Sequence, residues 1–470
     1  MAVHVAPNHS PRLTRPHGRS HKCQPETDEP SNQMTPLQAV KGMNDVLPEE
    51  IGRWQHVEHA FARTMSLHAF REVRTPSIEA TGLFERAIGN TTDVVEKEMY
   101  SFEHRGEALT LRPEGTAGAV RAYVEHAVHG KEAVTRWWYA GAMFRAERPQ
   151  RGRYRQFHQL GAELFGDPGP ACDAEMIDML VGFLRELAIP DVEVLLNSLG
   201  SPPARLAYRD ALVQYLEPRI SSLSPESQRR IHTNPLRVID SKDERDQRAI
   251  ADAPILLDFI DADDREHFRK LRGELDALGT PYSVDSRLVR GLDYYTRTLF
   301  EIKGAREKLG AGSTLLGGGR YDVLVAELGG PQVPAIGFAA GLERLLIASG
   351  IEATPSRIVD VLVAPVGPEA LTPGLVLARD LRARGVRCEM DTRGSSLKSQ
   401  LRRANVLGAR MVLILGATEL ADGVVQLKDL DAHTQERLPR DEGLRTVADR
   451  LAAASRVGDA HDVASHRNQK

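Results

Sequence analysis

The sequence predicts an α+β protein: a first domain built on an antiparallel sheet, interrupted by a helical insertion, and followed by a small α/β domain. Residues 136–145 and 156–165 are strand-like runs joined by a loop at 146–155, which is the pattern of a long hairpin. Residues 203–281 are rich in charge and helical in pattern, without strand alternation. Beyond residue 358, short apolar runs alternate with helical stretches, which is typical of a largely parallel sheet.

The other elements of the first domain follow from local patterns. An amphipathic helix is expected over residues 48–69, because Trp54, Val57 and Phe61 recur at helical spacing. The next run alternates like a strand, with Pro76 marking an edge or a break. The remaining expected segments are a strand and turn at 109–116, a helix at 117–126, strands at 283–288 and 294–302, a glycine cluster at 317–319 and a small-residue segment at 335–344.

In the second domain we expect strands at 359–364, 386–390 and 411–415, and helices at 369–384 and 395–407. Lysine and arginine outnumber acidic residues between 376 and 410. Solvated helix faces or contact with RNA would each explain this excess. The predicted boundaries are a disordered N-terminal extension at 1–36, a first domain at 37–351, its insertion at about 203–281, a linker at 352–357, a second domain at 358–456 and a flexible tail at 457–470.

Composition excludes several classes of protein. The chain has 470 residues, of which 41% are hydrophobic and 27% charged, as in soluble globular proteins. No apolar run approaches the roughly 18 to 20 residues that cross a bilayer, so a membrane-spanning protein is excluded. The three cysteines, Cys23, Cys172 and Cys388, form no Cys-x-x-Cys pair, which favours a reducing cytoplasm over a disulfide scaffold or a cysteine zinc site. The net charge of −4 requires any nucleic-acid binding to rely on local basic patches.

The first residues have too few large apolar side chains to offset the entropy of ordering, so the sequence predicts disorder there. They contain no apolar core of a signal peptide. An organellar transit peptide is the alternative for this basic stretch, although no amphipathic period supports it. Met34 is an alternative start that the sequence leaves open.

The loop of the long hairpin is the strongest local signal. Within residues 136–155, the single acid Glu147 is outnumbered by arginines at positions 136, 145, 148, 151, 153 and 155. The planar guanidinium group suits phosphate oxygens, so this density points to a polyanion site, with a solvated basic loop as the alternative. No Gly-x-x-x-x-Gly-Lys-Ser/Thr loop is present, and the histidines show no metal-ligand spacing. If ATP is used, arginines on an antiparallel sheet must hold it.

Several motifs, taken in order, resemble class II aminoacyl-tRNA synthetases and specifically the histidyl-tRNA synthetases. The helix and strand around Pro76 are similar to the first class II motif, which builds the dimer interface in that family. The matching runs are Leu111-Arg-Pro-Glu-Gly-Thr116, Met143-Phe-Arg-Ala-Glu-Arg-Pro149 with Arg153-Tyr-Arg-Gln-Phe-His-Gln159, Leu288-Val-Arg-Gly-Leu-Asp-Tyr-Tyr295, Gly318-Gly-Arg-Tyr-Asp322 and Gly337-Phe-Ala-Ala-Gly-Leu-Glu-Arg344.

The resemblance implies roles for individual residues. Arg145 and Arg290 are the implied catalytic residues, and both would contact the α-phosphate and the attacking histidine carboxylate. Arg145, Arg153 and Arg344 would bind ATP. The remaining histidine-binding positions are Glu114, Gly115, Thr116 and Gln159 around the ammonium group, and Glu163, Tyr294, Tyr295 and Tyr321 around the imidazole.

The resemblance also implies substrates and partners: L-histidine, ATP with Mg²⁺ and histidine tRNA, with the enzyme a cytoplasmic homodimer and no membrane partner. Arg148 and Gln150 are candidates for the extra 5′ guanosine of that tRNA. No side chain is assigned to a metal. Two alternatives are the non-catalytic synthetase-like regulatory subunit of ATP phosphoribosyltransferase, and a class II synthetase for proline, threonine or glycine.

Overall fold

The computed structural model describes residues 37–89, 92–305, 309, 313–352 and 357–467, with side chains described as far as residue 453. The predicted extension at 1–36 and most of the predicted linker lie outside the described residues. No helix in the described part of the chain is long and apolar enough to cross a membrane.

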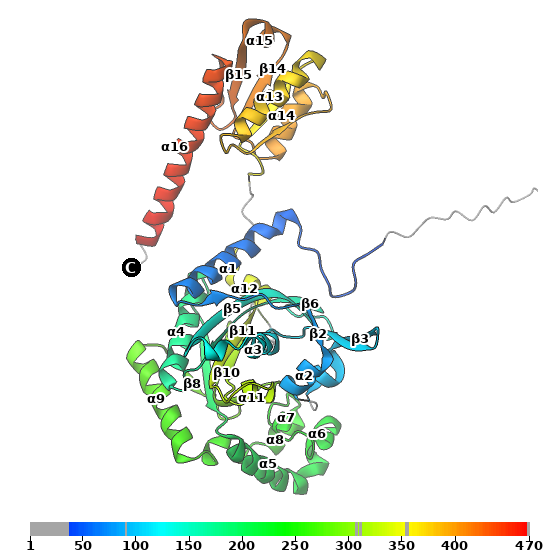
Figure 1. Cartoon of the computed structure of the whole chain (residues 1–470), viewed down its shortest axis with the longest axis vertical. Coiled ribbons are helices and arrows are strands. Elements are labelled where there is room, and N and C mark those ends of the chain that lie inside the picture. The colour runs from blue at the N-terminus through cyan, green and yellow to red at the C-terminus, as the bar shows by residue number, and fades with distance from the viewer. Residues whose placement is uncertain (1–36, 90–91, 306–308, 310–312, 353–356, 468–470) are drawn as a thin grey trace, which may run out of the picture. The chain divides into compact units, whose positions relative to one another are not determined.

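An eight-stranded sheet forms the centre of the first domain, with strand order β1-β5-β6-β11-β10-β9-β7-β8 (Figure 1). Only the edge pairs β1–β5 and β7–β8 are parallel, and the other neighbours are antiparallel. Its strands are β1 (Arg71–Glu72), β5 (Thr135–Phe144), β6 (Gln156–Phe165), β7 (Glu193–Ser198), β8 (Ser283–Val284), β9 (Thr296–Lys303), β10 (Thr314–Arg320) and β11 (Ala335–Gly341).

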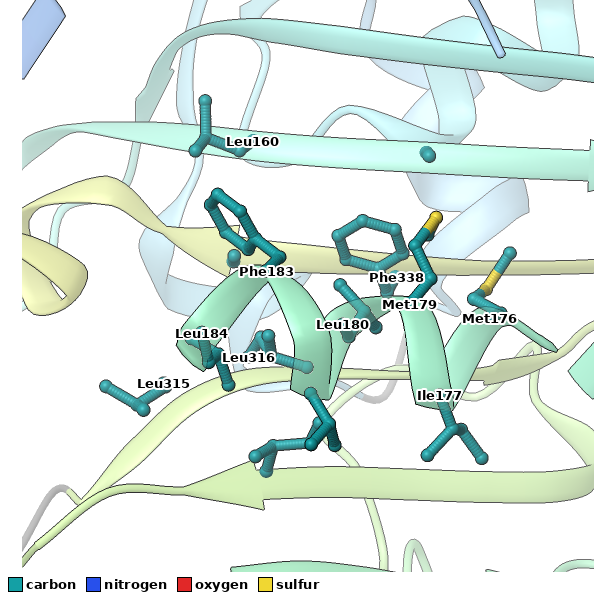
Figure 2. Close-up of a cluster of buried hydrophobic side chains, with 14 of the residues drawn as sticks. Leu160, Met176, Ile177, Met179, Leu180, Phe183, Leu184, Leu315, Leu316 and Phe338 are labelled. Atoms are coloured by element: carbon teal, nitrogen blue, oxygen red, sulfur yellow. The ribbon is translucent and has the colours of Figure 1, made fainter. Parts of the chain in front are cut away.

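Helices α1 (Pro48–Leu67), α4 (Pro170–Glu186), α9 (Ala262–Leu278) and α12 (Leu342–Ser349) contribute to the core on one face of this sheet. Figure 2 shows the α4 side chains Leu180 and Phe183 beside Leu160 of β6 and Phe338 of β11. Burying a side chain of this size contributes about 1.5–3 kcal/mol, so packing rather than intrinsic helix propensity stabilises α4.

Alternation along β6 separates this core from the other face. Leu160, Ala162 and Leu164 enter the core shared with α4, whereas Phe165 packs in a second cluster with Tyr294, Tyr295 and Tyr321. Because side chains of a strand alternate between faces, Gln159 and Glu163 lie on the face of Phe165.

That second face is covered by short helices and a smaller sheet. The three-stranded sheet has the order β2-β4-β3. These elements are β2 (Ile78–Ala80), α2 (Thr81–Ile88), a π-helical turn (Val94–Glu98), β3 (Tyr100–His104), β4 (Glu107–Leu111), α3 (Thr116–Glu125), a 3₁₀ turn (Val128–Gly130) and α11 (Leu324–Glu327).

A helical insertion separates β7 from β8. Before α9 it consists of α5 (Pro202–Leu216), α6 (Pro225–Arg230), α7 (Leu236–Ile239) and α8 (Glu244–Ala249), with 3₁₀ turns at Glu217–Ser222 and Leu256–Asp258. Tyr208, Leu212 and Leu216 of α5 are buried in the cluster that also holds Tyr294 and Tyr295. The insertion therefore shares a core with the second face of the sheet.

The second domain has a five-stranded sheet of order β13-β12-β14-β15-β16. Its elements are β12 (Val361–Pro365), a 3₁₀ turn (Pro368–Ala370), α13 (Leu371–Arg382), β13 (Cys388–Met390), α14 (Leu397–Val406), β14 (Met411–Leu415), α15 (Ala417–Asp422), β15 (Val424–Asp429), β16 (Thr434–Pro439) and α16 (Arg440–Arg467). Helix α16 extends into residues for which the sequence predicts a flexible tail, and that tail stays a prediction.

The α+β class, the helical insertion and the small α/β domain are confirmed. The glycine cluster, for which the sequence predicts no secondary structure, lies inside strand β10. Two local expectations were wrong. The expected strand at 283–288 is only two residues long, because Leu288 N–H donates to the Asp285 carbonyl in a turn. Strands β15 and β16 pair antiparallel, so the second sheet is mixed rather than largely parallel.

Candidate active site

The predicted site residues come from four separate places in the chain. Strand β6 carries Glu163, the start of α3 carries Thr116, the segment before β9 carries Tyr294, and the end of β10 leads into Tyr321. Glu163 is fully buried, and the two tyrosines are 4% and 1% exposed. The fold thus gathers these residues into one buried group on the second face of the large sheet.

The Glu163 carboxylate is the centre of this group. Thr116 Oγ1 donates to Glu163 Oε1 over 2.8 Å, and the Tyr139 hydroxyl donates to the same oxygen over 3.0 Å. The Tyr321 hydroxyl donates to Oε2 over 2.5 Å. Burial raises the pKa of Glu163 to about 8, against the opposing effect of these donors. A carboxyl that titrates near neutral pH can either accept or donate a hydrogen bond.

Tyrosine rings surround the carboxylate. The rings of Tyr294 and Tyr295 are 4.7 Å apart, and those of Tyr294 and Tyr321 are 5.6 Å apart, measured between centroids. Burial raises the pKa of Tyr139, Tyr294 and Tyr321 well above the ordinary value of a phenol. These hydroxyls therefore stay protonated and able to donate.

Glycines provide the space that this arrangement needs. A Cβ atom on Gly337 of β11 would lie 1.6 Å from Glu163 Oε2. One on Gly319 would lie 3.0 Å from the Tyr295 ring, and one on Gly317 would lie 2.7 Å from the Arg290 guanidinium group. The glycine cluster keeps a strand conformation, and the missing side chains of Gly317 and Gly319 leave room on the site face.

Glu114 caps helix α3 from within the site. Its carboxylate accepts from the backbone N–H groups of Thr116 (2.6 Å) and Ala117 (2.8 Å), and it is 4% exposed. Burial raises its pKa, although these two amides favour the charged form. Gly115 stands at the N-cap position of the same helix, where a Cβ atom would lie 2.2 Å from the Tyr139 ring.

Gln159 has an unsatisfied acceptor. It lies on β6, four residues before Glu163 and on the same face of the sheet. Its Oε1 atom is buried and has no hydrogen-bond partner among the described residues. A buried acceptor without a partner costs free energy, which a bound donor would recover.

Arginines with spare donors form a second group. Arg145 Nε donates to the Pro113 carbonyl over 2.9 Å, and Arg290 Nη1 donates to Glu301 Oε2 over 2.6 Å. Arg344 Nη1 donates to the Thr314 carbonyl over 2.8 Å. Since a guanidinium group has five N–H donors, each of these arginines keeps donors for a ligand.

The arginines also lie close enough to influence one another. Burial lowers the pKa of Arg344, and the positive charges of Arg153 and Arg290 lower it further. Arg153 Nη1 pairs with Glu147 Oε2 at 3.2 Å and its side chain is 45% exposed. The region around Arg344 is therefore positively charged and partly open to solvent.

A pocket of about 460 Å³ opens on the hairpin loop. It is lined by Glu98, Glu147, Arg148, Pro149, Gln150 and Arg153. Arg148 and Gln150 are exposed, so neither is held in the tyrosine-lined group. Among the predicted site residues, Arg153 lines the same pocket.

Sequence reasoning missed three residues of this site. Tyr139 lies on the predicted aromatic strand, and its position opposite Gly161 of β6 was the available signal. Glu301 holds Arg290 and also accepts from Thr314 Oγ1 over 2.7 Å, but nothing in its local sequence distinguishes it. Arg112 joins segments of the first domain by donating to the carbonyls of Ala142 (2.9 Å) and Thr75 (3.0 Å).

Comparison with known proteins identifies similar chains. The family model for histidyl-tRNA synthetase matches residues 42–345, and the model for an anticodon binding domain matches residues 360–450. The histidine–tRNA ligase of Sorangium cellulosum is 57% identical over 418 residues, covering 89% of this chain and 97% of the relative. That of Geobacter sulfurreducens is 47% identical over 404 residues, covering 86% and 97%. The crystal structure of apo S. aureus histidyl-tRNA synthetase has a TM-score of 0.73 at 33% identity, covering 88% of this chain and 100% of that one.

Proposed function

The chain belongs to the histidyl-tRNA synthetase family, and from this premise we propose how its residues join histidine to tRNA. The reaction is that of a histidine–tRNA ligase. A carboxylate oxygen of histidine attacks the α-phosphorus of ATP, the bond to the β,γ-phosphates breaks and pyrophosphate leaves. A ribose hydroxyl at the tRNA 3′ end then attacks the carbonyl carbon of the adenylate, and AMP leaves.

Glu163 recognises the imidazole in this proposal, and that assignment rests on the hydrogen bonds around the carboxylate. Among the described residues, Oε1 already accepts two hydroxyl donors, whereas Oε2 accepts one, from Tyr321. Oε2 therefore retains a lone pair for an imidazole N–H. A neutral imidazole also has one acceptor nitrogen, which a protonated tyrosine hydroxyl of Tyr294 or Tyr295 would satisfy.

Such a pocket explains selectivity without a separate editing site. An amino acid that lacks the imidazole N–H would leave the buried Glu163 without its donor. Sites built for hydrogen bonds reject analogues that lack them by about 10⁴ to 10⁵. The buried polar centre is therefore the single observation that carries the specificity for histidine.

The histidine ammonium group is assigned to Glu114, Thr116 and Gln159. Glu114 uses one lone pair on each oxygen for the α3 amides and keeps the others. The unsatisfied Oε1 of Gln159 is the strongest support, because an ammonium group supplies the donor that it lacks. Gly115 makes room for the Tyr139 ring at the start of α3, beside the proposed ammonium site.

The phosphates of ATP are assigned to the arginines. Arg145 and Arg290 would neutralise charge that develops on the α-phosphoryl oxygens as pyrophosphate leaves. Arg153 and Arg344 would hold the outer phosphates and the adenine. Enzymes of this class use ATP with a divalent metal ion. Within the described residues, no group of three or more His, Cys, Asp or Glu side chains could hold a metal ion, so we propose that Mg²⁺ enters on the ATP phosphates.

The tRNA would contact two regions. Arg148 and Gln150 line the hairpin-loop pocket, whose size and exposed polar side chains suit a nucleotide such as the extra 5′ guanosine. The second domain, which matches an anticodon binding model, would hold the other end of the tRNA. Lys398, Arg402 and Arg410 are candidate phosphate contacts there.

We propose a homodimer that uses the small sheet. Register places Ile78, Tyr100 and Leu111 side by side, and likewise Ala80, Phe102 and Leu109, all on one face. Ile78 and Phe102 are each 45% exposed in the single chain. A second copy would remove this apolar face from water, which is a large favourable contribution to association. We place the enzyme in the cytoplasm, where its cysteines would stay reduced.

The regulatory-subunit alternative is not favoured. The relative that is 57% identical over 89% of the chain is a histidine–tRNA ligase, and the anticodon binding model matches the second domain. A proline, threonine or glycine synthetase would not be expected to match the histidyl-tRNA synthetase model over residues 42–345.

The test is amino-acid-dependent exchange of pyrophosphate into ATP by the full chain. We expect exchange with histidine and none with proline, threonine or glycine. Exchange that responds to one of those three would overturn the histidine assignment. Failure of all amino acids to support exchange would overturn the catalytic one.

A further inference from the structure

Tyr294 and Tyr295 lie in the segment of residues 288–295. The two ends of this segment are held by different parts of the molecule. At its start, Asn197 Nδ2 of β7 donates to the Leu288 carbonyl over 3.0 Å. Arg290 is held separately by Glu301. The phosphate-facing part of the segment is therefore fixed by strands β7 and β9.

The far end of the segment is held by the helical insertion. Arg205, in the first turn of α5, donates from Nη1 to the carbonyls of Asp293 and Tyr295, each over 2.8 Å. The first carbonyl belongs to the peptide unit before Tyr294 and the second to the peptide unit after Tyr295. One guanidinium group therefore fixes the backbone on both sides of the tyrosine pair.

A second insertion helix secures the next residues. Arg297 has a positive φ of 43°, which is unusual for a residue with a side chain. Its Nε donates to the buried Asp264 of α9 over 2.8 Å, and its backbone pairs with Leu199 and Gly200. The start of strand β9, directly after Tyr295, is thus held by residues of α9 and of the loop before α5.

Among the described residues, the hydrogen bonds of the Arg205 guanidinium group go to two main-chain carbonyls and not to a carboxylate. Burial lowers its pKa, against the opposing charges of Asp293 and Glu327. In the described part of the chain this partly buried group therefore holds backbone rather than forming a surface ion pair. Its bonds to the segment are instead strong, because the donor is charged.

We propose that Arg205 is a positioning residue for histidine recognition, through which the helical insertion fixes Tyr294 and Tyr295 around the imidazole. This inference rests on the proposed function, since it presumes that the tyrosines bind histidine. Its consequence is specific. Loss of Arg205 should weaken the binding of histidine while leaving that of ATP intact, because Arg290 and Arg344 are anchored by other residues.

The experiment compares Arg205→Ala and Arg205→Lys with Arg209→Ala in pyrophosphate exchange. Arg209 lies one turn further along α5, and its guanidinium also donates to two carbonyls, those of His232 and Thr233 within the insertion. Arg209→Ala therefore removes an equivalent side chain at a position away from the site, and it serves as the matched control. Thermal melts of all variants would report their folding.

For Arg205→Ala we expect a rise of about 10- to 100-fold in the KM for histidine, the range of one hydrogen bond to a charged group. The KM for ATP should stay within about twofold, and kcat should change less than the histidine KM. Arg205→Lys keeps the charge but has fewer fixed donors, so its histidine KM should lie between those of the parent and Arg205→Ala. Arg209→Ala should match the parent.

Three results would overturn the inference: an unchanged histidine KM in both Arg205 variants, an equal rise in the KM values for histidine and ATP, or an equal effect of Arg209→Ala. A parent enzyme without histidine-dependent exchange would instead contradict the proposed function. The two failures are therefore distinguishable. If Arg205→Ala does not fold, Arg205→Lys carries the same test.

Discussion

The tyrosine-lined pocket and the arginine group differ in how their polar atoms are used. Around Glu163, hydroxyl donors already satisfy most of a fully buried carboxylate. Around Arg145, Arg290 and Arg344, each guanidinium group makes few bonds and the region is partly open to solvent. The polar atoms of the first region are therefore largely paired without a substrate. The second region keeps N–H donors that a negatively charged substrate would pair. Recognition of histidine thus depends on buried hydrogen bonds, whereas catalysis depends on neutralising charge that develops in the transition state.

The largest expected effect is on the arginine side of this comparison. Arg290→Ala should lower the kcat of pyrophosphate exchange by about 10² to 10³, because removal of one donor to a developing oxyanion costs about 2.7–4 kcal/mol. Arg151→Ala, which removes an exposed arginine of the hairpin loop, is the matched control and should exchange normally. Near-normal exchange by Arg290→Ala would remove Arg290 from the mechanism.

In the tyrosine-lined pocket, ionisation of Glu163 should affect how the free energy of unfolding depends on pH. Burial raises the folded-state pKa of Glu163 from 4.5 to about 8, so the folded state holds the proton more tightly than the unfolded state. Its contribution to stability is present below pH 4.5 and is lost as pH rises towards 8. Glu163→Gln cannot ionise and should lack this loss.

Urea unfolding of both proteins at pH 5.5 and 8.5 measures the difference. The parent should lose roughly 3 kcal/mol more than Glu163→Gln between these two pH values. Other titrating groups, such as the buried Asp173, are common to both proteins and cancel. Parallel pH profiles would mean that Glu163 is ionised across the range and that burial does not dominate its titration.

A smaller effect is expected from filling the space beside Glu163. The Cβ atom of Gly337→Ala would overlap the carboxylate, which three hydroxyl donors hold in place. Overpacking of this kind costs about 1–3 kcal/mol, so the histidine KM should rise on the order of 10- to 100-fold. Gly341→Ala on the same strand meets nothing closer than 3.7 Å and serves as the control. Equal KM values for the two variants would argue against a fixed carboxylate.

The sequence predicted the long hairpin closely, because its two strands show a clear pattern on both sides of a polar loop. The predicted strand at 156–165 has the bounds of β6, and the one at 136–145 is shifted by one residue from β5. Strand β10 was missed, since three consecutive glycines carry no alternation and have low strand propensity. The close approach of Arg290 explains Gly317 and that of Tyr295 contributes at Gly319, whereas Gly318 faces Phe300 and the Gly337 carbonyl, and these contacts are visible only in the fold.

Site residues were predicted from motifs, whereas their partners were not. Glu163, Tyr321 and Thr116 lie far apart in sequence, and no local pattern indicates that two of them donate to the third. Glu301 and Arg205 are ordinary charged residues in their own segments, and only their contacts with the Arg290–Tyr295 segment give them a role. Local chemistry is readable from the sequence, but long-range hydrogen bonding requires the fold.

The most direct test of the account is a crystal structure of the enzyme with histidinol and ATP. We expect an imidazole nitrogen within hydrogen-bond distance of Glu163 Oε2, and guanidinium nitrogens of Arg145 and Arg290 on the α-phosphate. An imidazole bound away from Glu163, or both arginines turned away from the nucleotide, would contradict it.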